Sequence, residues 1–412
     1  MSLKLIDRRL LTILLIVFVQ MVGAAMVLPI LPLFAQREFD MSPGVITLLI
    51  SAFFAAQFLG GPYLGRLSDQ YGRLPVLIVS QVGTAISFVM LGGATSVWML
   101  FAARLLDGIT GGNIIVAQAY ITDITPREQR TAALGYIFAV FGLGFIFGPA
   151  LGGVLSAAFG PRVPFLIAAA AALAAVMMTW RVLDETVTDE QKATSRTQRG
   201  SLALRVILSN TPLMIVLVIG FVGQFALGLL QSTFALYSEA VLFAGESEET
   251  VNLGVGLLLA VVGMGQLLTQ TVLLKRLLAR FGDIWLVFAG SIVRSLGLLI
   301  FAIFTTPLFG AFGSLFFAIG MGLLMPPLQS LTTQTVPDAL RGGALGVYQS
   351  SVGLATIVST AVAGTIFAVN VTMPYWFGAV ISLLALIPAL FLPYQMRRQQ
   401  EALQISGTPA AD

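Results

Sequence analysis

The chain contains neither cysteine nor histidine. Without cysteine it can form no disulfide and has no thiolate nucleophile. Without histidine it lacks the side chain that most often carries protons near neutral pH, and also the commonest metal ligand. Any proton coupling must therefore use a carboxylate. No metal site, no cofactor and no enzymatic activity are expected, because there is also no clustered acid pair and no phosphate-binding Walker sequence.

Charge is scarce as well. Only 10% of the 412 residues are charged, whereas a soluble protein carries roughly 25%. Hydrophobic residues make up 57% of the chain, and the mean hydropathy is +0.94. The apolar runs are each near the ~20 residues with which a helix spans a bilayer, and they lack the alternation of barrel strands. We therefore expect an all-α membrane protein. The net charge of +3 does not indicate a nucleic-acid partner, because the basic residues lie between the apolar runs.

Twelve of these runs are predicted to be transmembrane helices. Their approximate limits are 10–34, 44–65, 74–94, 98–120, 131–157, 163–182, 211–240, 251–274, 284–303, 309–331, 342–367 and 373–393. The first run is too long for a cleavable signal peptide, so it is expected to be the first span. Pro29 and Pro32 in span one, and Pro326 and Pro327 in span ten, are expected to bend their helices.

Lysine and arginine are distributed unevenly between the two sides of these spans. Of the 22, 18 lie on the side of the two termini, Arg37 and Arg162 lie on the other side, and Arg104 and Arg294 lie inside spans. Positively charged loops remain in the cytoplasm. We therefore expect both termini to be cytoplasmic, in a multi-pass protein of the cell (inner or plasma) membrane. We expect a monomer.

The two halves of the chain repeat each other. The stretch TPREQRTAALG at Thr125–Gly135 returns as VPDALRGGALG at Val336–Gly346, 211 positions later. Duplicated hydrophobic halves are typical of alternating-access transporters, with the substrate between them. We predict two pseudo-symmetric six-helix bundles at 1–182 and 211–395. A charged cytoplasmic linker at 183–210, interpreted as a simple tether, joins them, and a cytoplasmic tail follows at 396–412.

The loop after the second span reads GPYLGRLSDQYGRLP at Gly61–Pro75. It resembles the cytoplasmic signature G-x-L-a-D-r-x-G-r of the major facilitator superfamily. The resemblance implies a gate that holds the cytoplasmic side closed in the outward-facing state; the alternative is plain anchoring of the loop. The gate residues would be Gly65, Arg66, Asp69, Gly72, Arg73 and Asp123. A decayed copy follows span eight, where Ala279 replaces the aspartate.

Spans four and five narrow the resemblance. Span four opens with the pattern Arg-x-x-x-Gly at Arg104–Gly108, and span five is rich in glycine. Both resemble the drug/proton antiporters of the superfamily, and the N-terminal half is most similar to tetracycline/proton antiporters and related twelve-span multidrug exporters. The span-five motif comprises Gly144, Gly148, Pro149, Gly152 and Gly153. Its glycines also permit close helix packing by themselves.

Arg104 and Asp107 are charged residues inside span four. They stand three positions apart, so they share one face of a helix. An ionisable group at this depth costs ~2.5–3.5 kcal/mol, so it usually faces a partner or a wet cavity. Asp107 is the only carboxylate placed well within a span. We therefore predict Asp107, with Arg104, as a proton-coupling site; the alternative is a mutually neutralising pair that only positions span four.

Two positions depart from the tetracycline exporters. The acidic residue of their span one is replaced by Gln20, and the acid of their span nine is replaced by Arg294. Both acids serve a cationic, metal-chelated substrate, so tetracycline is not expected to be the substrate. Arg294 could bind an anionic group, or it could extend to the interface or pair with a helix carbonyl.

Uncharged amides in the spans are further candidates for the substrate cavity, because polar side chains at lipid depth prefer bundle interiors. The predicted cavity residues are Gln20, Asn113, Gln118, Gln224, Gln231, Arg294 and Gln329. Each amide could instead form an interhelical hydrogen bond.

We predict a secondary active transporter that exports hydrophobic or amphiphilic small molecules by alternating access, in proton-coupled antiport. Its expected partners are a small-molecule or lipid-like substrate, the proton and the bilayer. The alternative is a lipid, lysolipid or organic-anion transporter of the same fold without drug/proton coupling. A channel fits the duplicated halves less well.

Overall fold

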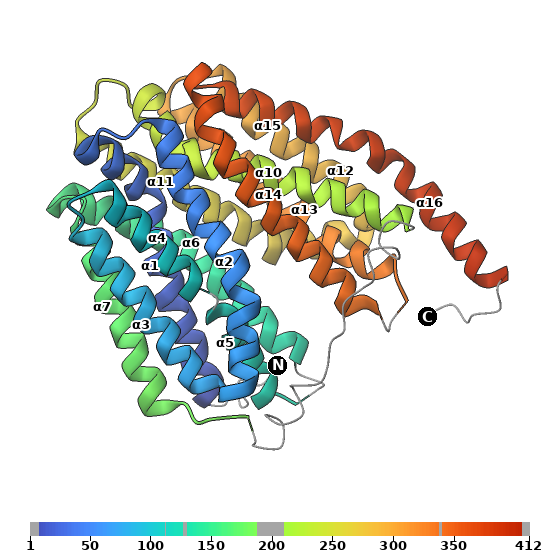
Figure 1. The fold of residues 1–412 in the computed structure, drawn as a ribbon. Helices are drawn as coiled ribbons and strands as arrows, with labels where there is room; N and C mark the ends of the chain where they lie inside the picture. The colour runs from blue at the N-terminus through green and yellow to red at the C-terminus, as the bar shows by residue number, and fades with distance from the viewer. Residues whose placement is uncertain (1–7, 112, 127–129, 188–209, 338–339, 406–412) are drawn as a thin grey trace. The chain divides into compact units, whose positions relative to one another are not determined.

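The computed structural model describes residues 8–111, 113–126, 130–187, 210–337 and 340–405. All regular elements in these ranges are helices (Figure 1). In the first half they are α1 (Arg8–Phe39), α2 (Pro43–Tyr71), α3 (Arg73–Gly92), α4 (Val97–Thr110), α5 (Asn113–Ile124), α6 (Arg130–Phe159) and α7 (Val163–Val182). The second half comprises α10 (Thr211–Tyr237), η2 (Ser238–Leu242), α11 (Glu248–Leu268), η3 (Thr269–Leu273), α12 (Leu274–Ile303), α13 (Pro307–Gln334), α14 (Arg341–Val369), α15 (Met373–Leu384) and α16 (Leu386–Ile405).

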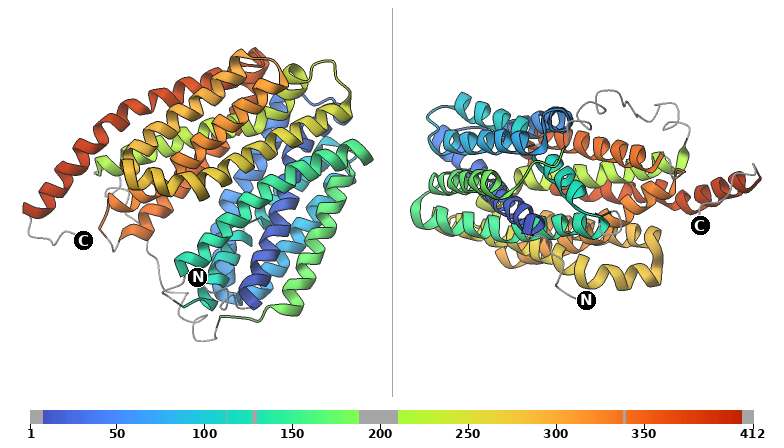
Figure 2. Two further views of the ribbon diagram at one scale, coloured as in Figure 1. Left: turned by 180° about the vertical axis from the view of Figure 1, so that it is seen from behind. Right: turned by 90° about the horizontal axis from the view of Figure 1, so that it is seen from below.

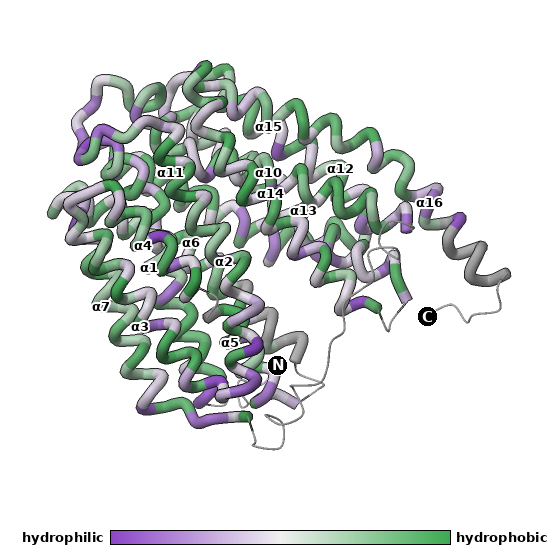
Figure 3. Tube along the Cα trace, viewed as in Figure 1, coloured by the Kyte–Doolittle hydropathy of each residue, from purple (hydrophilic) through white to green (hydrophobic). Residues whose placement is uncertain are grey.

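Eleven helices in the described ranges are long and apolar enough to cross a membrane. One of them, Glu248–Ile303, has 56 residues, enough for two crossings, and is interrupted at Gly282, where φ is 77°. These helices therefore account for the twelve predicted spans, and the all-α fold is confirmed. Hydrophobic colour covers most of each span in Figure 3, while hydrophilic colour is concentrated near helix ends.

Span four differs from the prediction of one helix over 98–120. It consists of α4, which ends at Thr110 with Gly111 as its C-cap, and α5, which begins at Asn113. Glycine is frequent at helix ends, because it stabilises a continuous helix less than the other ordinary residues do. Pro29 and Pro32 lie inside α1, and both prolines of span ten lie inside α13, so these helices are continuous; the bends expected there stay a prediction.

The chain divides into two compact units. Unit 1 holds the described residues up to 187 together with Ser232–Met264, and unit 2 holds the rest. The segment Ser232–Met264, which the sequence analysis assigned to the second bundle, thus groups with unit 1. The predicted boundaries at 182, 210 and 395 stay a prediction.

Each unit has its own apolar core. In unit 1, α1 packs beside α6 and α3 beside α7 (Figures 1 and 2). One cluster of its buried side chains includes Ile13, Leu77 and Tyr120. In unit 2, α12 packs along α13 and α15, and the corresponding cluster includes Leu213, Leu328 and Tyr348. Burial of such side chains is worth about 1.5–3 kcal/mol each against water, but lipid is apolar as well, so close packing contributes more in a bilayer.

Candidate functional site

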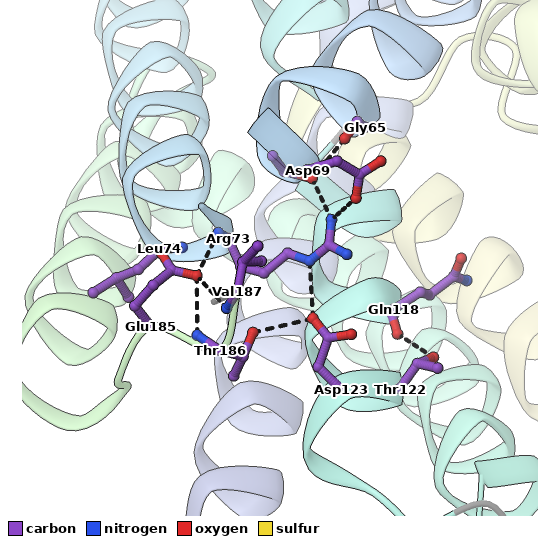
Figure 4. A network of polar contacts seen from close by, with 11 residues as sticks. Gly65, Asp69, Arg73, Leu74, Gln118, Thr122, Asp123, Glu185, Thr186 and Val187 are labelled. Carbon is purple, nitrogen blue, oxygen red and sulfur yellow. Dashed lines mark hydrogen bonds and ion pairs between the residues drawn. The ribbon is translucent and has the colours of Figure 1, made fainter. Parts of the chain in front are cut away.

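Arg73 lies at the centre of a charged cluster in unit 1 (Figure 4). Its Nε donates to Asp123 Oδ2 at 3.0 Å, and its Nη1 donates to Ser68 Oγ at 2.8 Å and forms an ion pair with Asp69. The cluster connects the ends of α2, α3 and α5. We call Asp69, Arg73, Asp123 and Glu185 the Arg73 cluster. The predicted gate residue Arg66 is exposed, whereas the carbonyl oxygen of Gly65 accepts a hydrogen bond from Ser68 Oγ at 2.7 Å and so adjoins the cluster (Figure 4).

Glu185 completes this cluster, and the sequence analysis missed it. Its Oε1 accepts from the backbone N–H of Arg73 at 2.9 Å, and its Oε2 accepts from that of Leu74 at 3.1 Å. The carboxylate therefore caps the positive N-terminus of α3. Burial would raise the pKa of Glu185, but hydrogen bonds from the backbone of Val187, Arg73, Leu74 and Thr186 outweigh it and lower that pKa.

Gly72 makes this cap possible. Its φ is 109°, a region that side chains rarely adopt, and an added Cβ would lie 2.7 Å from the carboxyl carbon of Glu185. Thr186 also donates to Asp123 Oδ2 at 3.1 Å. The described part of the predicted linker, 183–187, is thus bound to the Arg73 cluster and is not a free tether.

Arg104 and Asp107 form a buried ion pair in unit 1. Arg104 Nη1 lies 2.7 Å from Asp107 Oδ2, and the two residues are 7% and 5% exposed. The guanidinium carbon lies 3.9 Å from the centre of the Phe53 ring of α2. Thr84 and Ser87 of α3 lie beside the carboxylate. Among the described residues, Asp107 is the only acidic one that is buried.

A glycine beside this pair allows α4 to approach α2 closely. An added Cβ at Gly108 would lie 2.6 Å from Ala56 Cβ. Arg104 Nε has no hydrogen-bond acceptor in the described part of the chain. The ion pair is therefore neutral as a whole, but one of its hydrogen-bond donors has no acceptor. Protonation of Asp107 would leave the buried charge of Arg104 without its partner and would strongly change the electrostatic energy of the pair.

The span-five motif lies between two helices within unit 1. An added Cβ at Gly144 would lie 2.6 Å from Met21 Cβ of α1, and one at Gly148 would lie 2.5 Å from Ala25 Cβ. An added Cβ at Gly152 would lie 3.0 Å from Met26 O of α1. On the α11 side, an added Cβ at Gly153 would lie 2.6 Å from Asn252 O, and one at Gly256 would lie 2.5 Å from Pro149 O. The glycines therefore bring α6 into backbone contact with both neighbours.

A second polar cluster, also missed from the sequence, involves the far end of α1. Arg37 Nη2 lies 2.7 Å from Glu239 Oε1, and its Nη1 lies 3.3 Å from both Glu248 Oε2 and Asn252 Oδ1. Asn252 Nδ2 in turn donates to Ser156 Oγ of α6 at 3.1 Å. The cluster of Arg37, Glu239, Glu248 and Asn252, here the Arg37 cluster, joins α1, η2, α11 and α6 within unit 1.

The predicted amides do not form a common network. Gln20 is buried at 8% exposure, and its Nε2 has no acceptor among the described residues. Gln224 donates to Thr356 Oγ1 at 2.9 Å, an interhelical hydrogen bond as the alternative interpretation expected. Gln118, Gln231 and Gln329 are half-buried. The side chain of Asn113 lies outside the described residues.

Arg294 is enclosed in unit 2 and is 1% exposed. Its Nη1 donates to Gly223 O at 2.9 Å, and its Nη2 donates to Ser382 Oγ at 2.9 Å. It therefore does not extend to a lipid-facing surface, and one of its partners is a helix carbonyl.

Unit 2 also contains an altered counterpart of the Arg73 cluster. Asp283 follows Gly282 as Arg73 follows Gly72, and both glycines have positive φ. Asp283 Oδ2 accepts from Gln334 Nε2 at 2.8 Å and from Ser330 Oγ at 2.9 Å. Gln334 stands 211 positions after Asp123. Unit 2 thus has a negative residue, Asp283, in place of the positive Arg73, and a neutral residue, Gln334, in place of the negative Asp123. A repeat that lacks a copy of Asp69 gives no sign of this pair.

Comparison with known proteins agrees with this architecture. The family model "Major Facilitator Superfamily" matches residues 13–254 and 246–410. The chain belongs to the major facilitator superfamily. The tetracycline resistance protein class H of Pasteurella multocida is 26% identical over 410 residues, covering 98% of this chain and 100% of that protein. The tetracycline resistance protein class D of Salmonella ordonez is 30% identical over 358 residues, covering 86% of this chain and 88% of that protein.

Other members of the superfamily are similar over comparable lengths. Multidrug resistance protein 2 of Bacillus subtilis (strain 168) is 26% identical over 378 residues, covering 90% of this chain and 91% of that protein. Among solved structures, the D-xylose–proton symporter has a TM-score of 0.74 at 18% identity, covering 93% of this chain and 96% of that one. These relatives are transporters, so the chain is a multi-pass membrane transporter of this superfamily.

Proposed function

We propose that the chain exports hydrophobic or amphiphilic small molecules by alternating access and that protons drive it in antiport. Drug export is supported by the sequence relatives, which are named for tetracycline or multidrug resistance. Proton coupling is supported by one observation: Asp107 is the only buried carboxylate among the described residues, in a chain without histidine. The substrate is a small molecule taken from or through the bilayer.

Coupling at Asp107 would follow from its pairing with Arg104. When Asp107 is ionised, the pair is neutral. When it is protonated, Arg104 keeps its charge among neutral neighbours, including Phe53. The two protonation states therefore favour different arrangements of α2, α3 and α4. A proton can drive a conformational change only through such a difference between states.

We also propose that the protein is a monomer of the cell membrane with both termini in the cytoplasm. The orientation of the termini is supported by the distribution of lysine and arginine, 18 on one side and two on the other. In this orientation the Arg73 cluster lies on the cytoplasmic side and the Arg37 cluster on the outer side. Each cluster would then stabilise closure of its own side.

The second candidate is a transporter of lipids, lysolipids or organic anions without drug/proton coupling. Two replacements favour it, because Gln20 and Arg294 stand where tetracycline exporters have acids. Transport in proteoliposomes would separate the candidates. A neutral drug, a lysophospholipid and a lipophilic cation would each be measured with and without an imposed pH gradient. Gradient-stimulated movement of the neutral drug supports the first candidate. Movement of the lysophospholipid alone, independent of the gradient, supports the second.

A further inference from the structure

The positive charge of Arg294 is not compensated within unit 2. Apart from Asp283 and Glu401, this unit's described residues contain no Asp or Glu, and Glu401 stands 19 positions beyond Ser382, which contacts Arg294. Asp283 stands 11 residues earlier in α12, roughly 16 Å along the helix axis at 1.5 Å per residue, and its Oδ2 is occupied by Gln334 and Ser330. In unit 1, by contrast, Asp107 neutralises Arg104 at 2.7 Å. Arg294 is thus the one buried charge without an opposite charge in the described chain.

The partners of Arg294 do not depend on it. Gly223 O belongs to the interior of α10, where a helical N–H also bonds it. Ser382 Oγ already donates to Gly378 O at 2.6 Å. The third contact, Met321 Sδ at 3.7 Å, is a weak acceptor. Arg294 Nε has no acceptor in the part of the chain that the structure describes. Removing the guanidinium would therefore leave no buried acceptor without a hydrogen bond that it needs, which is unusual for a purely structural arginine.

The groups around Arg294 suit an oxyanion. Glycine at 223 lets the guanidinium reach the α10 backbone, because an added Cβ would lie 3.0 Å from Nη1. Tyr348 of α14 reaches the same place through Met325, whose Cε lies 3.3 Å from the added Cβ at Gly223. Its hydroxyl donates only to Met325 Sδ at 3.5 Å, again a weak acceptor. A carboxylate or phosphate would accept stronger hydrogen bonds from both residues and would balance the charge.

We propose that Arg294 and Tyr348 bind the oxyanion headgroup, a carboxylate or phosphate, of an amphiphilic molecule. This inference rests on the proposed function, because it names the substrate class of the same transporter. The headgroup can come from a transported amphiphile or from an anionic membrane lipid, and both present the same chemistry to the two donors.

Three probes with one tail length would test the proposal. Dodecanoate, dodecanol and dodecyltrimethylammonium carry negative, zero and positive charge. Their affinities for the full chain in phosphatidylcholine nanodiscs would be measured by calorimetry, with protein-free nanodiscs as blanks. We expect dodecanoate to bind the wild type about 10- to 100-fold more tightly than dodecanol, the range of one charge-assisted hydrogen bond. Arg294→Gln should remove this difference, Tyr348→Phe should reduce it, and Arg294→Lys should retain most of it.

Thermal unfolding of the same variants separates binding from a structural role. Because no partner depends on the guanidinium, Arg294→Gln without ligand should be at least as stable as the wild type. A lower stability of this variant, together with unchanged dodecanoate affinity, would show that Arg294 only holds helices together and would overturn the proposal. So would tightest wild-type binding of the cation.

The source of the headgroup, and the dependence on the proposed function, are tested separately. If a membrane lipid is the ligand, adding phosphatidylglycerol to the nanodiscs should stabilise the wild type but not Arg294→Gln, and should weaken dodecanoate binding. If a transported amphiphile is the ligand, phosphatidylglycerol should have no such effect. Asp107→Asn should keep the preference for dodecanoate, since Asp107 lies in unit 1. Loss of gradient-driven transport with this preference intact would support both proposals. Persistent gradient-driven transport with the preference intact would refute only the coupling role of Asp107.

Discussion

Replacement of Asp69 by asparagine should shift the protein away from the state in which the Arg73 cluster closes the cytoplasmic side. The substitution removes one of the two ion pairs of Arg73. The side chains of Asp69 and Asp123 are 44% and 30% exposed, so solvent screens both pairs. Pairs of this exposure are worth about 0.2–1 kcal/mol. If the pair forms fully only in the closed state, its loss changes the ratio of the two states by up to about fivefold.

The shift can be measured by double electron–electron resonance in nanodiscs. The chain has no cysteine, so labels can be introduced without background. Tyr71 and Phe281 are repeat-equivalent positions with 66% and 49% exposure, and they provide the label pair. Asp184→Asn is a matched control, because its pair with Arg9 is 68% and 46% exposed and lies outside the cluster. A distance distribution unchanged by Asp69→Asn, or shifted equally by the control, would refute the gating role.

Three further predictions concern stability. Glu185 has a lowered pKa in the folded state, so the stability that it contributes is present above the ordinary carboxyl range and is lost as the pH falls through that lowered pKa. The difference in apparent Tm between the wild type and Glu185→Gln should therefore shrink in acid. A difference that stays constant with pH would contradict the cap. Arg37→Gln should lower the apparent Tm more than Glu248→Gln, because Glu239 is 27% exposed and Glu248 is 74% exposed; equal effects would count against the Arg37 cluster. Gly148→Val should cost about 1–3 kcal/mol of packing, whereas Gly346→Ala, with nothing within 4 Å of the added Cβ, should be tolerated; thermal unfolding in detergent checks both.

The all-α fold was predictable because each apolar run of residues indicates one helix. The sequence repeat indicated that the two halves of the chain are related. The spacing of Arg104 and Asp107 likewise indicated a shared helix face, and their atoms lie 2.7 Å apart. Helix continuity was less predictable, since the predicted span four consists of the separate helices α4 and α5. This outcome depends on neighbours that satisfy or displace backbone groups.

The missed contacts join residues far apart in sequence. Arg73 and Glu185 are separated by 112 positions, and Arg37 and Glu239 by 202. No local periodicity encodes which acid reaches which arginine, because the choice depends on the packing of helices between them. The only available signals were the position of Glu185 just after a span and the isolated arginine at the end of α1. Asp283 was missed for another reason: its charge is opposite to that of Arg73, so the repeat preserves the position but not the residue type.

Transport in proteoliposomes can show whether protons drive the protein through Asp107. Substrate movement would be followed in proteoliposomes that contain wild type or Asp107→Asn, with an imposed pH gradient and, separately, with substrate exchange at equal pH. Asparagine keeps the shape of the side chain but cannot release a proton, and Arg104 retains its charge beside it. We predict that the variant loses gradient-driven transport while exchange remains measurable. Gradient-driven transport by Asp107→Asn at the wild-type rate would show that Asp107 does not couple protons to transport.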